Sequence, residues 1–194
     1  MNALTAAAVL ELAVACAPQA APQTLLAISH AESRLDPLAI GVNGPDPTSL
    51  RPRTKPQAVS MARDLIAQGR SIDLGLGQIN SANLQWLGLS IEAAFEPCAN
   101  LKAAAQVLLS GYRPQEGRRA FDAALSRYNT GHPRRGLANG YVARVAQIQA
   151  SLARQATASS LPIDRGGADD VFASRTARSL HVFRNPPLMI GALP

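Results

Sequence analysis

The sequence predicts a mainly helical fold that contains one small irregular or short-strand segment near residues 71–80. Apolar residues recur at helical spacing in several stretches, for example at Leu101, Ala105 and Leu108. Prolines stand where helices begin and glycines where they end, which divides the chain into separate helices. The stretch SIDLGLGQINSAN, by contrast, mixes two glycines with amide side chains, and glycine weakens both helices and strands.

The helices follow from these signals in chain order. The first is alanine-rich and stops before Pro18, Pro22 opens the second, and Pro56 and Gly69 bracket the third. Serine caps introduce two short helices, and three further segments show apolar residues on one face. The expected helices span residues 3–16, 22–35, 56–68, 82–87, 91–95, 98–111, 117–129 and 141–152, and residues 41–55 form a proline-rich loop.

The length of the chain suits one domain with a substantial core, and 47% of its residues are hydrophobic against 16% charged. Helical periodicity fades after about residue 156, where turn-forming residues dominate. We therefore expect a domain at 1–156 and a flexible, proline- and glycine-containing tail at 157–194. Two apolar stretches of this tail, LHVF and PPLMIGALP, are candidates for contact with the domain or with a partner.

The net charge of +6 comes from 17 arginines and two lysines against 13 acidic residues. A basic surface suits nucleic acid, an acidic membrane surface or an anionic polymer such as a cell wall, and it also occurs without a dedicated partner. Basic and aromatic residues are not interleaved, so we expect no nucleic-acid partner. No run of 18 apolar residues occurs, so we expect no membrane span.

Cys16 and Cys98 are far apart, form no CxxC pair and have no histidine nearby, so we expect no metal site there. We expect a disulfide, which suits an oxidising compartment such as a periplasm, with two buried thiols as the alternative. The N-terminal stretch lacks a basic residue near Met1 and carries Glu11, so no export signal is evident. We interpret this stretch as the first helix of the domain.

Glu32 lies on the apolar face of its expected helix. Leu25, Ile28, Glu32 and Leu35 are spaced at i, i+3, i+7 and i+10, which places them in one stripe. Burial disfavours an ionised carboxylate, so the pKa of Glu32 should rise, and a protonated glutamic acid can act as a general acid near neutral pH. The alternative is a glutamate at the rim of the helix that reaches solvent.

The glycine- and amide-rich stretch about forty residues later suits a polysaccharide ligand. Hydroxyl and N-acetyl groups need partners that both donate and accept, which amide side chains such as Gln78 and Asn80 provide. Glycines let the backbone approach a sugar closely. We expect Trp86 to pack in the core rather than stack on a sugar, and His30 and His132 to have no catalytic role.

Four stretches occur in this order: HAESRLDPLAIG, DLGLGQIN, EPCANLKAAAQVLL, and LSRYNTG followed by YVARV. Together they resemble the lytic transglycosylase domain of the lysozyme superfamily, in particular the small periplasmic transglycosylases that accompany type IV secretion and conjugation machinery. The resemblance covers roughly residues 10–152. It implies an α+β, lysozyme-like fold, in which a helical bundle surrounds a glycan-binding cleft.

The resemblance also implies roles for individual residues. Glu32 corresponds to the catalytic acid and base, and Asn100 to a mainly structural asparagine. Gly77 replaces the methionine of the family's Gly-Leu-Met-Gln motif, and Thr130 replaces the alanine of its Tyr-Asn-Ala-Gly motif. The residues implied in substrate binding are Ser33, Gly75, Leu76, Gly77, Gln78, Asn80, Tyr128, Asn129 and Tyr141.

The implied reaction cleaves the β-1,4 bond between N-acetylmuramic acid and N-acetylglucosamine in peptidoglycan and leaves a 1,6-anhydro ring. It needs no cofactor and no metal. The implied partners are glycan strands and, through the tail, components of a type IV secretion or conjugation system in the periplasm.

Asp73 leaves an alternative reaction open. As a second carboxylate paired with Glu32 it would favour attack by water, and the protein would be a hydrolytic, lysozyme-like muramidase. Otherwise Asp73 is a cap or turn residue ahead of Gly75. A further alternative is a catalytically idle glycan-binding module that serves assembly.

Overall fold

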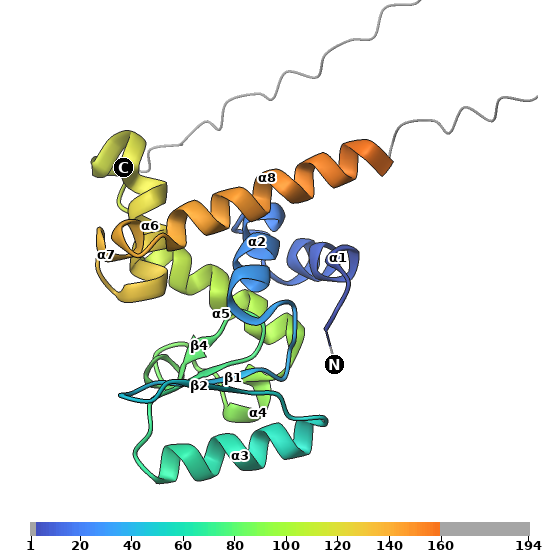
Figure 1. Cartoon of the computed structure of the whole chain (residues 1–194), viewed down its shortest axis with the longest axis vertical. Helices are drawn as coiled ribbons and strands as arrows, with labels where there is room; N and C mark the ends of the chain where they lie inside the picture. Colours follow the sequence, from blue (N-terminus) through green and yellow to red (C-terminus); the bar gives the residue numbers. More distant parts are fainter. Residues whose placement is uncertain (1–2, 160–194) are drawn as a thin grey trace, which may run out of the picture. The chain divides into compact units, whose positions relative to one another are not determined.

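The computed structural model describes residues 3–159, which are mainly helical, as the sequence predicts (Figure 1). The longer helices are α1 (Ala6–Cys16), α2 (Pro22–Ser33), α3 (Lys55–Ala67), α5 (Pro97–Ser110), α6 (Ala120–Thr130) and α8 (Tyr141–Ser159). Between them lie two single-turn helices, α4 (Ile91–Ala94) and α7 (Arg135–Ala138), and two 3₁₀ helices, η1 (Ser81–Asn83) and η2 (Pro114–Arg119).

Local sequence signals explain where the helices begin and end. Thr5 and Thr54 cap α1 and α3, because each side chain accepts a hydrogen bond from the backbone N–H three residues further on. α2 and α5 begin with Pro22 and Pro97, since the first turn of a helix does not need the missing N–H. Gly131 ends α6 in the left-handed conformation, with φ 69°.

The expected helices at 82–87 and 117–129 differ from the structure. Residues 82–87 form no α-helix: η1 ends at Asn83, and the chain folds back because Gly88 takes a φ of 59° and the Leu89 N–H donates to the Leu84 carbonyl. α6 begins three residues later than expected, because Gly117 has the non-helical angles φ 60° and ψ −132°. The single turn α7 was not predicted.

A four-stranded antiparallel sheet has the strand order β2-β1-β3-β4. Its strands are β1 (Ile40–Val42), β2 (Thr48–Leu50), β3 (Ile72–Leu74) and β4 (Ile79–Asn80). The predicted short-strand segment near 71–80 is confirmed. The interpretation of 41–55 as a loop is wrong, because β1 and β2 form a hairpin and β1 also pairs with β3. Side chains alternate along β3, so Ile72 and Leu74 are buried while Asp73 points to the opposite face.

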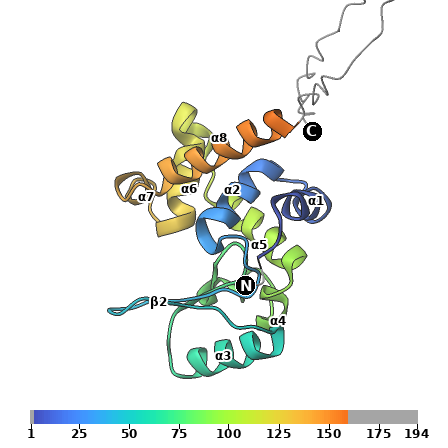
Figure 2. The same ribbon diagram turned by 45° about the vertical axis from the view of Figure 1, so that its right-hand side comes forward.

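The sheet has a hydrophobic cluster of its own. Ile40, Ile72 and Leu74 pack there with Ala58 and Ala62 of α3. Figures 1 and 2 both show α3 beside the sheet, on the side away from α2, α6 and α8.

α2 packs against helices on several sides. Its Leu25 and Leu26 belong to the cluster formed with α1 and α5, and its Ala27 and Ile28 to the cluster formed with α6 and α8. The last turn of α2, which carries Glu32, is therefore held in place by the helical core.

A disulfide joins Cys16 at the end of α1 to Cys98 in the first turn of α5, so the expected pairing is confirmed. α8 extends to Ser159, past the expected helix end at residue 152. From residue 160 on, the expected tail lies outside the described residues. Between residues 3 and 159, no helix combines the length and the hydrophobicity that crossing a bilayer requires.

Candidate active site

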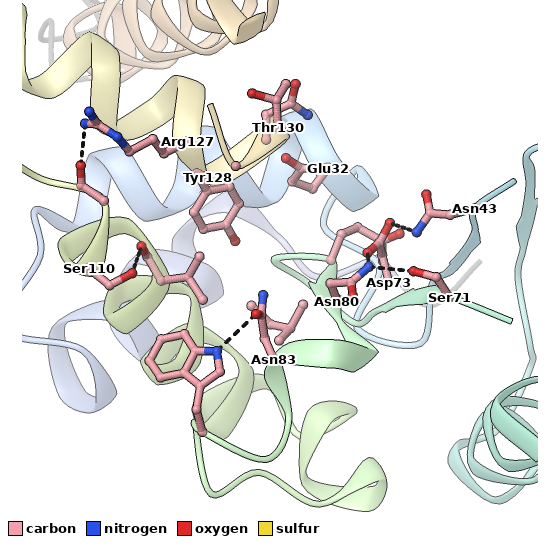
Figure 3. A pocket seen from close by; sticks show the side chains of 17 residues that line it. Glu32, Asn43, Ser71, Asp73, Asn80, Asn83, Ser110, Arg127, Tyr128 and Thr130 are labelled. Atoms are coloured by element: carbon pink, nitrogen blue, oxygen red, sulfur yellow. Dashed lines mark hydrogen bonds between the residues drawn. The ribbon is translucent and has the colours of Figure 1, made fainter. Parts of the chain in front are cut away.

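A cleft of about 620 Å³ lies between the sheet and the helices α2, α5 and α6 (Figure 3). Its lining is mostly polar and uncharged, with amides contributed by Asn43, Gln78, Asn80, Asn83 and Asn129. The charged side chains in the lining are Glu32, Asp73 and Arg127, and Arg127 is paired with Glu116. Such a lining suits a neutral ligand that is rich in hydroxyl and amide groups.

Glu32 points into the cleft from the last turn of α2 and is partly buried. Its pKa is raised from an ordinary 4.5 to about 7, chiefly because burial removes water from the carboxyl. The Tyr141 hydroxyl and Arg144 lower this pKa, and the negative charge of Asp73 raises it. A carboxyl with a pKa near 7 is protonated in a large fraction of molecules at neutral pH, as a general acid must be.

The structure places Tyr141 in the core at the start of α8, with 1% of its surface exposed, rather than in the lining of the cleft. Its hydroxyl is buried and has no hydrogen-bond partner of good geometry among the described residues. The Glu32 carboxyl nevertheless interacts with it, since each group shifts the pKa of the other. Arg144 lies 5.4 Å from the centroid of the Tyr141 ring. Tyr141 therefore lies beside the acid and outside the lining of the cleft.

Asp73 lies in strand β3 and lines the cleft, so the alternative of a cap or turn residue is wrong. Its carboxylate accepts hydrogen bonds from Asn43 Nδ2 at 2.9 Å and from Asn80 Nδ2 at 2.7 Å. Burial raises the pKa of Asp73, and these two amides lower it. Asn80 Nδ2 also donates to Ser71 Oγ, so the carboxylate is held by a small polar network (Figure 3).

The loop between β3 and β4 is held in place by Asn100, a residue of α5 that is 1% exposed. Its Oδ1 accepts from the Gly77 N–H at 2.7 Å, and its Nδ2 donates to the carbonyls of Leu74 at 2.8 Å and Ala94 at 2.6 Å. This fits the mainly structural role that the resemblance implies for Asn100.

Gly75 and Gly77, which the sequence was expected to place along a sugar, are buried and are not part of the cleft lining. A Cβ on Gly75 would collide with Asn100 and the Ala94 carbonyl, and its φ of +72° also favours glycine. A Cβ on Gly77 would lie 2.8 Å from Tyr128 Oη, whose hydroxyl donates to the Gly77 carbonyl at 2.6 Å. Both glycines therefore permit close packing inside the protein.

We predict that Gly77→Ala destabilises the fold by about 1–3 kcal/mol, because the added methyl group would lie 2.8 Å from the Tyr128 hydroxyl and 2.9 Å from the Ala104 Cβ. Urea unfolding of Gly77→Ala, Tyr128→Phe and the double variant measures this coupling. Gly77→Ala should destabilise less in the Tyr128→Phe background. Equal destabilisation in both backgrounds would show that the hydroxyl is not the obstacle.

Other residues expected to bind substrate divide into two groups. Ser33 and Leu76 are fully buried, and the Ser33 hydroxyl donates to the Ser29 carbonyl, so the structure keeps both out of the cleft. Gln78 and Asn129 line the cleft. The Gln78 amide is already engaged by two backbone carbonyls, whereas the Asn129 carbonyl oxygen accepts from Asn139 at 2.9 Å.

Trp86 is not a core residue, contrary to the expectation. It lines the cleft and is 53% exposed. Asn43 was also missed, since nothing in its neighbourhood in the sequence points to Asp73.

His30 and His132 are exposed and do not line the cleft. No cluster of three or more potential metal ligands occurs within residues 3–159.

Comparison with protein families gives a match between residues 10–150 and the model of the transglycosylase SLT domain. The chain belongs to this family. The match includes every element that lines the cleft, from α2 to α6.

Curated relatives of this SLT-domain chain include Protein virB1 of Agrobacterium fabrum (strain C58 / ATCC 33970), 42% identical over 134 residues, which are 67% of this chain and 54% of the relative. Protein virB1 of Rhizobium radiobacter is 43% identical over 141 residues, 71% of this chain and 59% of the relative. The type IV secretion system protein virB1 of Brucella abortus biovar 1 (strain 9-941) is 39% identical over 129 residues, 63% of this chain and 54% of the relative.

The chain thus matches a little over half the length of these relatives. No solved structure matches it significantly.

Proposed function

We propose that this protein is a lytic transglycosylase that cleaves the β-1,4 bond between N-acetylmuramic acid and N-acetylglucosamine in peptidoglycan. The observation that supports this most is the Glu32 carboxyl, which has a pKa of about 7 and points into an amide-lined cleft. Membership of the SLT domain family supports the same reaction.

Glu32 acts twice in the proposed reaction. It donates its proton to the bridging oxygen, and the bond from that oxygen to C1 of the muramyl residue breaks as positive charge develops on C1. The substrate's own N-acetyl group stabilises this centre. The Glu32 carboxylate then removes the proton of the C6 hydroxyl, whose oxygen bonds to C1 and closes the 1,6-anhydro ring. No water is consumed, and Glu32 ends protonated.

The neighbours of Glu32 have supporting roles in this proposal. Tyr141 orients the carboxyl from inside the core, because its buried hydroxyl interacts with Glu32. Asn129, exposed in the lining and held by Asn139, is placed to bind the acetamido group of the substrate. Tyr128 holds the loop at Gly77 through its hydroxyl and presents its ring to the cleft.

We further propose that the protein opens the cell wall in the periplasm for a type IV secretion or conjugation apparatus. The relatives named type IV secretion system protein virB1 support this setting. The Cys16–Cys98 disulfide supports an oxidising compartment outside the cytoplasm. The idea that the tail recruits apparatus components concerns residues outside the described part of the chain.

Hydrolysis is a second candidate, because Asp73 lines the same cleft and its charge acts on Glu32. An ionised Asp73 would stabilise the positive centre long enough for water to attack it. Mass spectrometry of digested muropeptides separates the two reactions. Anhydromuramyl ends support the transglycosylase, whereas reducing muramyl ends, heavier by one water, establish the hydrolase.

We predict that the cleavage rate falls as the pH rises through about 7, because Glu32 must be protonated to donate and its pKa is about 7. The rate of peptidoglycan clearing, measured from pH 5 to pH 9 at constant ionic strength, tests this. Circular dichroism at each pH establishes that the protein stays folded. A rate that is constant or still rising at pH 9 would exclude Glu32 as the general acid.

A further inference from the structure

Trp86 is exposed although its neighbours are anchored. Leu84, Leu87 and Leu89 are partly buried and pack against hydrophobic clusters of the domain, while the indole between them remains 53% exposed. An exposed large apolar side chain is informative where it lies in a cleft, since burying it there on binding is favourable. Packing within the domain thus does not account for this tryptophan.

The indole is also fixed in orientation. Its Nε1–H donates to Asn83 Oδ1 at 3.0 Å, so the polar end of the side chain is satisfied within the protein. Asn83 belongs to η1, which is tied to the sheet because Ser81 Oγ accepts from the Ile72 N–H at 3.2 Å. A ring held in this way loses little conformational freedom when a ligand binds.

Asn83, which binds the indole, and the polar network around Asp73 lie in different parts of the cleft. In Figure 3, Asn83, the partner of the indole, lies apart from the network of Asn43, Ser71 and Asp73. The lining shared with Trp86 includes the apolar side chain of Val107 from α5. The lining therefore combines polar and charged groups with an aromatic and an aliphatic side chain.

We infer that Trp86 forms a sugar-stacking subsite, in which the apolar C–H face of an uncharged N-acetylhexosamine ring lies on the indole. This rests on the proposed function, because it takes a glycan strand as the ligand. Contact between an aromatic ring and an apolar sugar face gives affinity without requiring charge. The subsite holds a sugar of the strand next to the reacting pair and sets the register in which the strand lies across Glu32.

The experiment uses the fact that Trp86 is the single tryptophan of the chain. Tetra-N-acetylchitotetraose is titrated into the full-length Glu32→Gln variant, which keeps the strand intact, while tryptophan emission is recorded. Stacking moves the indole out of water, so we expect a saturable blue shift. Calorimetry then compares Trp86→Ala, Trp86→Phe and the control Leu137→Ala, whose side chain is 45% exposed and does not line the cleft.

Trp86→Ala should weaken binding about five- to tenfold. Trp86→Phe should retain part of the affinity, and Leu137→Ala should bind like the parent. Heat of binding without a change in emission, or no binding at millimolar sugar, would overturn the subsite. Neither result would contradict the cleavage of peptidoglycan by the wild type. A saturable blue shift in the Glu32→Gln variant, together with a wild type that does not cleave peptidoglycan, would support the subsite and contradict the proposed enzymatic function.

Discussion

Glu32→Gln is expected to lower the rate of peptidoglycan cleavage by about 10²–10⁴-fold, because the amide cannot donate a proton to the leaving oxygen. The change keeps the size and shape of the side chain within the cleft. Zymography in a gel that contains cell wall, followed by rate measurements on purified peptidoglycan, tests this. Glu11→Gln is the matched control, since Glu11 is exposed on α1 and should clear the gel like the wild type.

The same variant should be at least as stable as the wild type at alkaline pH. The folded-state pKa of Glu32, about 7, exceeds its ordinary value of 4.5, so the folded protein holds the proton more tightly than the unfolded chain does. The contribution of Glu32 to the free energy of unfolding is therefore lost as the pH rises from about 4.5 to 7. Glutamine removes this effect, so the Tm of Glu32→Gln minus that of the wild type should increase across this interval. Undiminished clearing by a folded Glu32→Gln would show that cleavage does not depend on Glu32, whereas no clearing by the wild type would leave only the idle glycan-binding module.

Asn100→Ala is expected to destabilise the fold by about 3 kcal/mol or more, because it leaves the Gly77 N–H and the carbonyls of Leu74 and Ala94 without their buried partner. For a chain of this length the Tm should fall by about 6–12 °C. The loop that carries Gln78 should also become mobile, so cleavage should weaken at temperatures where the variant is still folded.

Gln106→Ala provides the comparison for Asn100→Ala. Gln106 lies on the same helix, α5, and also loses an amide, but its side chain is exposed. Calorimetric melting of both variants tests this. The Tm of Gln106→Ala should be close to that of the wild type, and the Tm of Asn100→Ala should be lower. If Asn100→Ala melts within about 2 °C of the wild type, the three hydrogen bonds do not hold the loop as described.

Helices were predictable from the sequence wherever short-range signals mark them. The proline at the start of α2 and the glycine after α6 act on the adjacent turn, so these helix ends are encoded locally. The β1–β2 hairpin was missed because its three-residue strands enclose a turn rich in glycine and proline. What stabilises β1 is its pairing with β3, where Ile40 lies opposite Leu74, and this partner is more than thirty residues away in the sequence.

In the candidate site, too, features encoded by neighbouring residues were predictable and contacts between distant residues were not. Glu32 was found because its neighbours in one helical stripe are apolar, which is a local property. The partner of Asp73, Asn43, lies 30 residues away, and the hydroxyl that occupies the space beside Gly77 comes from Tyr128, 51 residues away. The glycines were assigned to a sugar because the sequence does not reveal which surface a backbone approaches. The exposure of Trp86 likewise depends on how Leu84 and Leu87 are anchored.

The link between Cys16 and Cys98 encloses α2, α3 and the whole sheet, so Glu32 and Asp73 lie within the closed loop and Tyr128 lies outside it. Cross-linking residues that are 82 positions apart lowers the entropy of the unfolded chain, which stabilises the fold by about 4.5 kcal/mol on the loop-closure model, a large part of the ~5–15 kcal/mol typical of a domain. The stability of the fold therefore depends on whether the compartment is oxidising or reducing. With the disulfide formed in an oxidising compartment the protein should resist proteases, and with both thiols reduced it should be degraded more readily.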